Sequence, residues 1–350
     1  MHCTLLVPDL FWPDDRAQEA CRDLAPRNLQ TLLSRARSER HSPIEIEGWL
    51  CQAFEVERQQ DWPVAPLTLV LDGGDTDDAY WLRADPVHLQ LQRDRVALMD
   101  PQTLQLSQQD ADALAAALNT QFAADGLRFE ARTPHRWYVR LPARPALTTV
   151  TLSAAAGHDA RDVLPQGTDA ASWRRVTNEI QMLMHAQPVN EARTDAGLPA
   201  INSIWLWGGG SHTPVPGRTF SAVWSDDALA LALGASADAH TAAIPADAHA
   251  WLAAAGALPV ECARHLLVVD ACARAVRYGD IGGWRNAIMA LEQQWIAPLM
   301  TALRNRQITQ LALAAPCAAA SWCFELAPAG LYKFWKPVRP LSYYGDYGAA

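Results

Sequence analysis

The sequence predicts an α/β protein in which helices flank a mostly parallel sheet and a smaller α+β lobe is inserted. Short, continuous apolar runs are typical of strands buried on both faces of a parallel sheet, and segments with helical apolar spacing stand between them. A stretch of alternating strands around a helix is typical of an α+β lobe. The chain has 350 residues, 50% hydrophobic and 19% charged, so it can bury a large core and is not globally disordered.

The first part of the predicted sheet lies in residues 1–78. The apolar runs 3–10 and 66–74 are predicted to be buried strands, and the carboxylates Asp9 and Asp72 stand near their ends. Two segments between these runs have helical periodicity, and they cover residues 29–37 and 46–54.

The inserted lobe is predicted over residues 79–199. Ser107 and Asp110 stand at the N-cap and acidic positions of a capping box, which marks the start of a helix. Pro188 stops the last helix of the lobe. The predicted order is strand, strand, helix, strand, strand, helix, over residues 79–92, 95–100, 107–122, 127–132, 136–141 and 170–187.

The sheet is predicted to resume in residues 200–341. A long helix over 281–306 carries an apolar stripe from Trp284 to Leu303, which we expect to face the core. Residues 342–350 have no periodicity and are expected to form a mobile tail. The buried strands expected in this part cover residues 203–210, 219–225, 265–272 and 308–315.

Charge and cysteine content exclude several classes of protein. The net charge of −9 argues against a general nucleic-acid binder, because such proteins need a positive surface. No apolar stretch reaches the roughly eighteen residues of a membrane-spanning helix, and the first residues lack the basic start of a signal peptide. The seven cysteines are odd in number and form no C-x-x-C pair, as expected of free thiols in a reducing compartment. We therefore expect a cytoplasmic protein that binds neither membranes nor nucleic acids.

Polar residues gather in residues 178–210, around a predicted helix end and the start of a predicted buried strand. Asn190, Arg193 and Asn202 could donate hydrogen bonds to a carboxylate or a phosphate. The glycines 208–210 could let main-chain N–H groups approach an anion. The structural alternative is that the asparagines cap helix and turn ends while the glycines only turn the chain. The residues alone leave both interpretations open.

The same segment resembles the archaeal-type cofactor-independent phosphoglycerate mutases, which belong to the alkaline phosphatase superfamily. That family usually has an arginine before the glycines, whereas this chain has Trp207. The resemblance implies an alkaline-phosphatase-like sheet with an inserted lobe. The residues that carry it are Asn178-Glu179, His185, Pro188-Val189-Asn190, Arg193, Gly197, Pro199-Ala200 and Asn202.

The resemblance also implies where substrate and metal would lie. Arg93 and Arg95 stand in QRDRVALMD, which is similar to an arginine-rich strand of the family, and both are candidate substrate positions. Arg136 stands in HRWYVRL, which is similar to the family's His-Arg strand. Asp9 ends a strand similar to the one that carries an N-terminal metal ligand, and Asp270 marks the end of the LLVVD strand.

The chain departs from the family at the catalytic centre. The superfamily uses two divalent metal ions, usually manganese or zinc, and a Ser or Thr nucleophile. Here Ala273 and Arg277 stand roughly where metal ligands belong, no Asp-His dipeptide occurs, and no histidine follows His265. We therefore predict no catalytic residue, no metal ion and no other cofactor.

Four segments are similar to the RpfE-type regulatory proteins of bacteria, an offshoot of this group. This second resemblance covers nearly the whole chain and implies a regulatory role. The four segments are VPDLFWP, APLTLVLDGGD, AYWLRADPVHL and WLWGGG.

We predict a catalytically degenerate, phosphoglycerate-mutase-like regulatory protein, a pseudoenzyme that binds a small phosphorylated ligand or a protein partner. The ligand site is expected in the cleft between the lobes. The basic, aromatic segment YKFWKPVRP, residues 332–340, is expected to form an ordered edge packed on the core, and the alternative is a surface that binds a partner. The alternatives are a divergent mutase or phosphohydrolase that uses manganese or zinc, and a scaffold without a ligand. The residues predicted to bind the anionic ligand are Asp9, Arg93, Arg95, Arg136, His185, Asn190, Arg193, Asn202 and Asp270.

Overall fold

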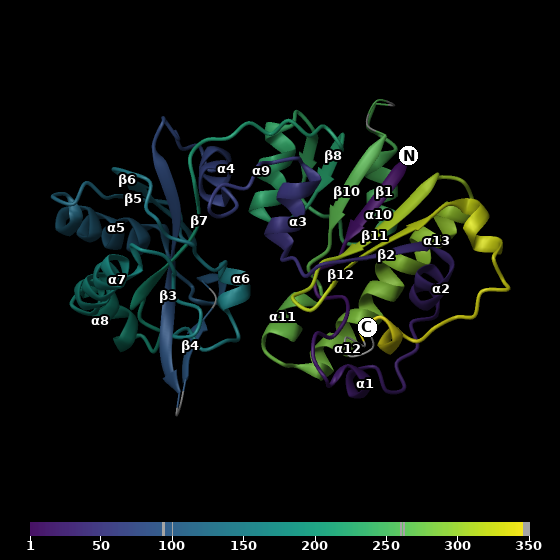
Figure 1. The fold of residues 1–350 in the computed structure, drawn as a ribbon, viewed down its shortest axis with the longest axis horizontal. Helices are drawn as coiled ribbons and strands as arrows, with labels where there is room; N and C mark the ends of the chain where they lie inside the picture. Colours follow the sequence, from purple (N-terminus) through teal and green to yellow (C-terminus); the bar gives the residue numbers. More distant parts are fainter. Residues whose placement is uncertain (93–94, 100, 260, 262, 346–350) are drawn as a thin grey trace. The chain divides into compact units, whose positions relative to one another are not determined.

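The computed structural model describes residues 1–92, 95–99, 101–259, 261 and 263–345. Its internal contacts divide the chain into two compact units (Figure 1). Unit 1 combines Met1–Glu55 with Val215–Ala350, and unit 2 is the continuous segment Val56–Pro214. This division differs from the predicted boundaries at 78/79 and 199/200, because residues 56–78 and 200–214 pack within unit 2.

Unit 1 is built on a seven-stranded sheet that is mostly parallel, as the sequence predicts. β1 pairs in parallel with both β10 and β11, whereas β12 runs antiparallel to β11 and to β2. Leu5 and Leu6 are both fully buried, so β1 is covered on its two faces, as strands of parallel sheets are. The strand order is β2 (Arg37–His41), β12 (Ser321–Leu326), β11 (Gln310–Ala315), β1 (His2–Leu6), β10 (Arg264–Val268), β8 (Ala222–Trp224) and β9 (His240–Ala242).

Helices of unit 1 pack on this sheet, and several of them share a hydrophobic core with its strands. Trp251, Trp284 and Leu32 come from three different helices and meet the strand residues Leu5 and Leu313 there. The helices of the unit are α1 (Ala17–Ala20), α2 (Arg27–Arg35), α3 (Ile46–Ala53), α9 (Ala228–Ser236), α10 (Ala248–Ala255), α11 (Ala273–Arg277), α12 (Ile281–Leu291) and α13 (Ala297–Arg304). Two 3₁₀ turns follow near the C-terminus, at Pro328–Tyr332 and Leu341–Tyr343.

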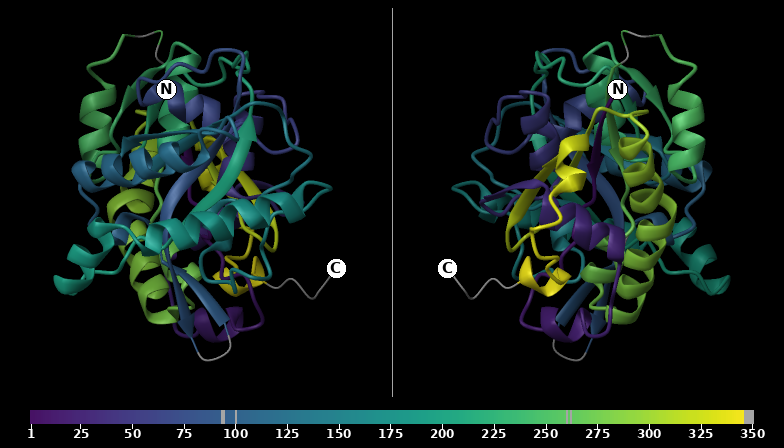
Figure 2. Two further views of the ribbon diagram at one scale, coloured as in Figure 1. Left: turned by 90° about the vertical axis from the view of Figure 1, so that its left-hand side faces the viewer. Right: turned by 90° about the vertical axis from the view of Figure 1, so that its right-hand side faces the viewer.

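The long helix predicted over 281–306 is present as α12 and α13, which a π-helical turn at Glu292–Ile296 joins into one column (Figure 2). Pro298 lacks the N–H that a regular helix would use, and a wider turn just before it accommodates this loss. Glu292, in the π-helical turn, is 7% exposed, and its carboxylate accepts hydrogen bonds from the main-chain N–H groups of Asn28 and Leu29, at 2.8 and 2.9 Å. This carboxylate therefore caps the start of α2.

Unit 2 is built on a five-stranded antiparallel sheet. β3 pairs with β7, β6 and β4, and β5 pairs with β6. The strands are β3 (Tyr80–Gln92), β4 (Arg95–Met99), β5 (Arg128–Thr133), β6 (Arg136–Leu141) and β7 (Ser203–Gly210). The helices are α4 (Val64–Leu71), α5 (Gln108–Phe122), α6 (Leu152–Ala155), α7 (Ala170–His185) and α8 (Pro188–Asp195), with a 3₁₀ turn at Pro101–Thr103.

The two faces of β3 differ in chemistry. Tyr80, Leu82 and Ala84 belong to an apolar cluster that also contains core residues of α5 and α7. Side chains alternate along a strand, so Arg83 and Asp85 lie on the opposite face, where Trp81 packs on α4. A polar pair is therefore placed on the face of the sheet that α4 covers.

Ser107 confirms the predicted helix start. Its hydroxyl accepts a hydrogen bond from the N–H of Asp110 at 3.1 Å, so Ser107 is the N-cap of α5.

Two of the predicted sheet strands are corrected by the structure. The run 66–74, predicted to be a buried strand, lies largely in α4, whose residues Val64 to Leu69 are all buried. A short run that is apolar on every side does not distinguish a buried strand from a buried helix. The run 203–210 is a strand, β7, but it pairs antiparallel with β3 in unit 2 and not in the parallel sheet.

None of the helices in the described part of the chain has the length and apolar character that crossing a bilayer requires. The first residues of the predicted mobile tail are packed, because Tyr344 is 5% exposed and stacks on Phe11, with 5.7 Å between ring centroids. The rest of that predicted tail, residues 346–350, lies outside the described residues.

Candidate functional site

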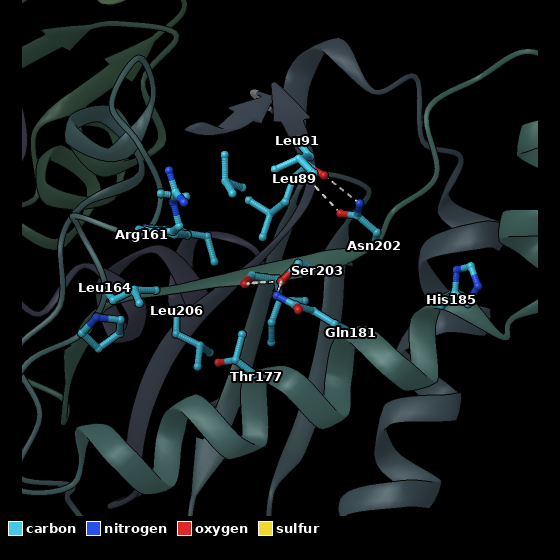
Figure 3. Close-up of a pocket in the computed structure, with 15 residues that line it drawn as sticks. Leu89, Leu91, Arg161, Leu164, Thr177, Gln181, His185, Asn202, Ser203 and Leu206 are labelled. Atoms are coloured by element: carbon cyan, nitrogen blue, oxygen red, sulfur yellow. Dashed lines mark hydrogen bonds between the residues drawn. The ribbon is translucent and has the colours of Figure 1, made fainter. Parts of the chain in front are cut away.

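A pocket of about 420 Å³ lies in unit 2 beside α7 (Figure 3). Residues of α7, β7, β4, the second half of β3 and the loop 160–165 line it. Thr177, Gln181 and His185 are spaced by four residues, so α7 presents all three on one side. His185 and Asn202 line the pocket, so the structure brings two of the predicted binding residues to the same site.

Neutral hydrogen-bonding groups lie on one wall of this pocket. Gln181 Nε2 donates to the Ser203 hydroxyl at 3.2 Å, and Ser203 is 1% exposed. The Asn202 side chain pairs with the main chain of Leu89, which donates to Asn202 Oδ1 at 2.8 Å and accepts from Nδ2 at 2.9 Å. Asn202 therefore ties the start of β7 to β3, while His185 is exposed at the end of α7.

Two further predicted binding residues, Asn190 and Arg193, are turned toward the main chain of unit 2. Each is 4% exposed. Asn190 Nδ2 donates to the carbonyls of Met184 and Ile201, both at 2.8 Å, and its Oδ1 accepts from the Ile201 N–H at 2.7 Å. Arg193 donates to the carbonyls of Pro199, Gln105 and Leu104. These contacts favour the structural interpretation for Asn190, and they give Arg193 a structural role that the sequence did not indicate. Anion binding by either residue stays a prediction.

Of the predicted arginines Arg93, Arg95 and Arg136, the structure describes the last two, and they have different partners. Arg93 lies outside the described residues. Arg95 is exposed on β4, and its Nε donates to Gln92 Oε1 at 2.9 Å. Arg136 instead forms an ion pair with Asp72, the residue that follows α4.

The Arg136–Asp72 ion pair joins β6 to the end of α4. Arg136 Nε and Nη2 donate to the two carboxylate oxygens of Asp72 at 2.9 and 2.5 Å, and the Tyr138 hydroxyl donates to Oδ2 at 2.6 Å. Burial raises the pKa of Asp72, but the hydrogen bonds from Arg136 and Tyr138 outweigh it, so the pKa lies below its ordinary value. Asp72 therefore stays ionised. Its negative charge offsets the positive charge of Arg136, the residue predicted to bind an anion.

A second ion pair lies fully inside unit 2, between Arg83 and Asp85 on β3. Arg83 Nε and Nη2 donate to Asp85 Oδ1 at 3.1 and 2.7 Å, and the Trp207 indole donates to Oδ2 at 2.8 Å. The Arg83 guanidinium also lies over the ring of Trp207, 5.1 Å from its centroid. Burial lowers the pKa of Arg83, but Asp85 more than compensates and raises it above the ordinary value. Sequence reasoning missed this pair, although the spacing i, i+2 of two charges inside an apolar strand was a signal for it.

The carboxyl ends of the parallel strands of unit 1 carry the other two predicted residues, Asp9 and Asp270. Asp9 adopts a positive φ of 53°, a conformation that aspartate tolerates better than most residues. Burial and the nearby charge of Asp270 raise the pKa of Asp9 to about 6, against the opposing effects of Arg277 and a hydrogen bond with Cys317. Asp9 is half-buried and Asp270 is exposed. We refer to Asp9, Asp270 and Arg277 as the sheet-edge cluster.

The donor set at this edge does not fit the two divalent ions that the family resemblance implies. Arg277 acts electrostatically on Asp9, and a fixed positive charge there disfavours a divalent cation. His265, the last histidine of the sequence, is 1% exposed and stacks on Trp224, whose indole donates to His265 Nδ1 at 3.1 Å. Among the residues that the structure describes, no group of three or more His, Cys, Asp or Glu side chains could hold a metal ion.

The basic, aromatic segment 332–340 exposes large apolar side chains. Tyr332 is 67% exposed, Phe334 81% and Trp335 68%. The only two lysines of the sequence, Lys333 and Lys336, stand among them. These three aromatic side chains do not pack on the core, contrary to the packed edge that we expected, and binding of a protein partner by this segment stays an alternative prediction.

Comparison with known proteins adds information on the fold. No protein-family model matches the chain, and no curated protein matches it in sequence. Among solved structures, the chain is similar to the PH0037 protein of Pyrococcus horikoshii, with 11% identity, a TM-score of 0.56 and coverage of 93% of this chain and 87% of that one. The cofactor-independent phosphoglycerate mutase of Thermoplasma acidophilum DSM 1728 is also similar, with 12% identity, a TM-score of 0.43 and coverage of 93% and 90%. The likeness to the Pyrococcus protein shows a shared fold.

Proposed function

We propose that this chain is a phosphoglycerate-mutase-like regulatory protein of the RpfE type, which binds a small phosphorylated metabolite and does not transfer its phosphoryl group. The observation that carries the proposal is the sheet-edge cluster of unit 1. Burial and Asp270 raise the pKa of Asp9, and Arg277 opposes part of that rise, so a positive charge acts on a carboxylate that the family resemblance assigns to metal binding. A guanidinium offsets carboxylate charge, but it cannot lower the pKa of a bound water or clamp an attacking oxygen as a divalent metal ion does.

The same edge has features that suit a phosphorylated ligand. Open α/β sheets bind ligands outside the carboxyl ends of their strands, which is where Asp9 and Asp270 stand. The short helix α11 carries Arg274, which is exposed, and Arg277, which is half-buried, on one side at i, i+3 spacing. Guanidinium groups bind phosphate oxygens through two parallel hydrogen bonds. We therefore place the phosphate of the metabolite against α11.

Thermal denaturation of the full chain with 3-phosphoglycerate, and with glycerate as the ligand without phosphate, tests this proposal. At about 100 times its Kd, we expect 3-phosphoglycerate to raise Tm by about 5 °C, while glycerate has no effect. The Arg277→Gln variant should lose the shift. The matched control Arg218→Gln, at a 75% exposed arginine paired with the exposed Asp238, should keep it.

Two results would contradict the proposal. One is a wild-type Tm that does not respond to 3-phosphoglycerate. The other is an equal response in the wild type and in Arg277→Gln, because the phosphate would then bind elsewhere. The Tm of each variant without ligand shows whether it folds.

A further inference from the structure

The pocket of unit 2 has the size of a small-molecule site. Its volume of about 420 Å³ falls within the range of roughly 300–1,000 Å³ that is typical of ligand pockets. Its floor includes the buried residues Ile204 and Leu206 of β7, which are 2% and 5% exposed. The pocket therefore reaches buried residues of the sheet.

Most of the lining is aliphatic. Leu89 and Leu91 come from β3, Val96 from β4 and Leu164 from the loop 160–165, and they join Ile204 and Leu206. Leu91 is 79% exposed, so a bound apolar group would remove a large part of its side chain from water. The lining thus favours an aliphatic ligand body.

The polar groups of the lining are mostly neutral. Figure 3 shows Thr177 and Gln181 on α7 near Ser203 on β7, and Gln181 Nε2 donates to the Ser203 hydroxyl at 3.2 Å. A carboxamide has two N–H donors and an acceptor oxygen, so Gln181 has further hydrogen-bonding capacity beyond this bond. One hydroxyl or amide group of a ligand would find partners on this wall.

The positive charge of Arg161 in the lining is compensated by the carboxylate of Asp159. Arg161 donates from Nε to both carboxylate oxygens of Asp159, at 3.0 and 3.1 Å, and from Nη2 to Oδ2 at 2.5 Å. A ligand carboxylate would have to compete with Asp159 for this guanidinium, and a ligand ammonium would face its positive charge. His185 is exposed and lies apart from Gln181 and Ser203 in the close-up (Figure 3).

We propose that this pocket binds a neutral small molecule with an aliphatic body and one hydroxyl or amide group. The aliphatic body contacts the leucine-rich wall, and the polar group bonds to Gln181 and Ser203. This site lies in unit 2 and shares no residue with the sheet-edge cluster. The proposal therefore does not depend on whether a phosphorylated metabolite binds in unit 1.

Calorimetric titration of the full chain with 1-octanol, octanoate and octylamine tests the ligand class. The three probes share one aliphatic body and differ in the charge of the polar group. We expect 1-octanol to bind about tenfold more tightly than either ion, because burying a charged group without a dedicated partner is unfavourable. Octanoate binding more tightly than 1-octanol would overturn the proposal in favour of an anion site, and undetectable binding of 1-octanol would overturn it outright.

A matched pair of variants tests the location. Leu91→Ser and Met182→Ser each replace an exposed apolar residue of unit 2, 79% and 75% exposed, but only Leu91 lines the pocket. We expect Leu91→Ser to weaken 1-octanol binding about 5-fold and Met182→Ser to leave it unchanged. Equal affinities in the two variants would overturn the location.

The polar wall is tested with Gln181→Leu and a probe that lacks a hydroxyl. This variant should weaken binding of 1-octanol and leave binding of 1-chlorooctane unchanged, and retained 1-chlorooctane binding also shows that the pocket is intact. If both probes weaken by the same factor, Gln181 does not bond to the hydroxyl and the proposed orientation is wrong.

Discussion

The side chain of Asp85 shows how individual residues of unit 2 are held. It is fully buried, and its carboxylate accepts hydrogen bonds from Arg83, from the main-chain N–H of Trp137 and from the Trp207 indole. Removing one partner of a buried charge usually costs more than the pair contributes, because the remaining group is left unsatisfied. Trp207, which stands where the mutase family usually has arginine, thus supplies one of the donors that Asp85 requires.

Replacement of Trp207 by phenylalanine tests this role. Trp207→Phe keeps an aromatic ring beside Arg83 and removes the N–H that lies 2.8 Å from Asp85. We expect the free energy of unfolding, measured in urea, to fall by about 1–3 kcal/mol. The control Trp335→Phe, at a 68% exposed residue, should change it little. Equal effects of the two substitutions would show that the indole bond to Asp85 contributes nothing.

The raised pKa of Asp9 predicts a dependence of stability on pH. With a pKa of about 6 in the folded protein and an ordinary value of 3.8, Asp9 binds a proton more tightly when the chain is folded. The folded state is therefore favoured by this group below pH 4, and that advantage is lost as the pH rises through 6. In Asp9→Asn this dependence is absent.

The measurement is the free energy of unfolding of the wild type and of Asp9→Asn, in urea at pH 4 and at pH 7. Relative to the wild type, Asp9→Asn should gain about 1–3 kcal/mol between the two pH values. A difference between the two proteins that stays constant over this range would mean that Asp9 has an ordinary pKa.

At the scale of helices and strands, local patterns predict most elements of this chain. Ser107 caps α5 as its place before an apolar repeat indicates, and the alternation in 79–92 correctly predicts β3. These signals depend on residues close together in the sequence, so they can be interpreted without knowledge of the tertiary contacts.

Elements defined by burial on all sides were harder to predict. The run 66–74 is mostly apolar, and its two polar residues Thr68 and Asp72 are four apart, a spacing that suits a helix but is too little to exclude a buried strand. In the structure α4 forms there, and its residues Val64 to Leu69 are all buried. Likewise, nothing within 203–210 indicates that β7 pairs with β3 instead of the parallel sheet. The partner of a strand is a long-range property that its own residues do not encode.

At the scale of the whole molecule, the fold class follows from the sequence but the division into units does not. The mostly parallel sheet is present, yet its order places β1 between β10 and β11, which lie more than 250 residues away along the chain. The candidate sites show the same limit. His185 and Asn202 were predicted and line the pocket of unit 2, whereas the roles of Gln181 and Arg277 depend on contacts with distant segments, Ser203 and Asp9.

The central claim is that this chain binds a phosphorylated ligand but no longer binds the two metal ions that catalysis would need. The most direct test measures the metal content and the catalytic turnover of the purified full chain. The protein is incubated with Mn²⁺ or Zn²⁺, dialysed, analysed for bound metal and assayed with 3-phosphoglycerate for 2-phosphoglycerate and for free phosphate. We predict metal far below one ion per chain and product no higher than in a protein-free control. Stoichiometric metal together with turnover that a chelator abolishes would contradict this claim and identify the chain as an active metal-dependent enzyme.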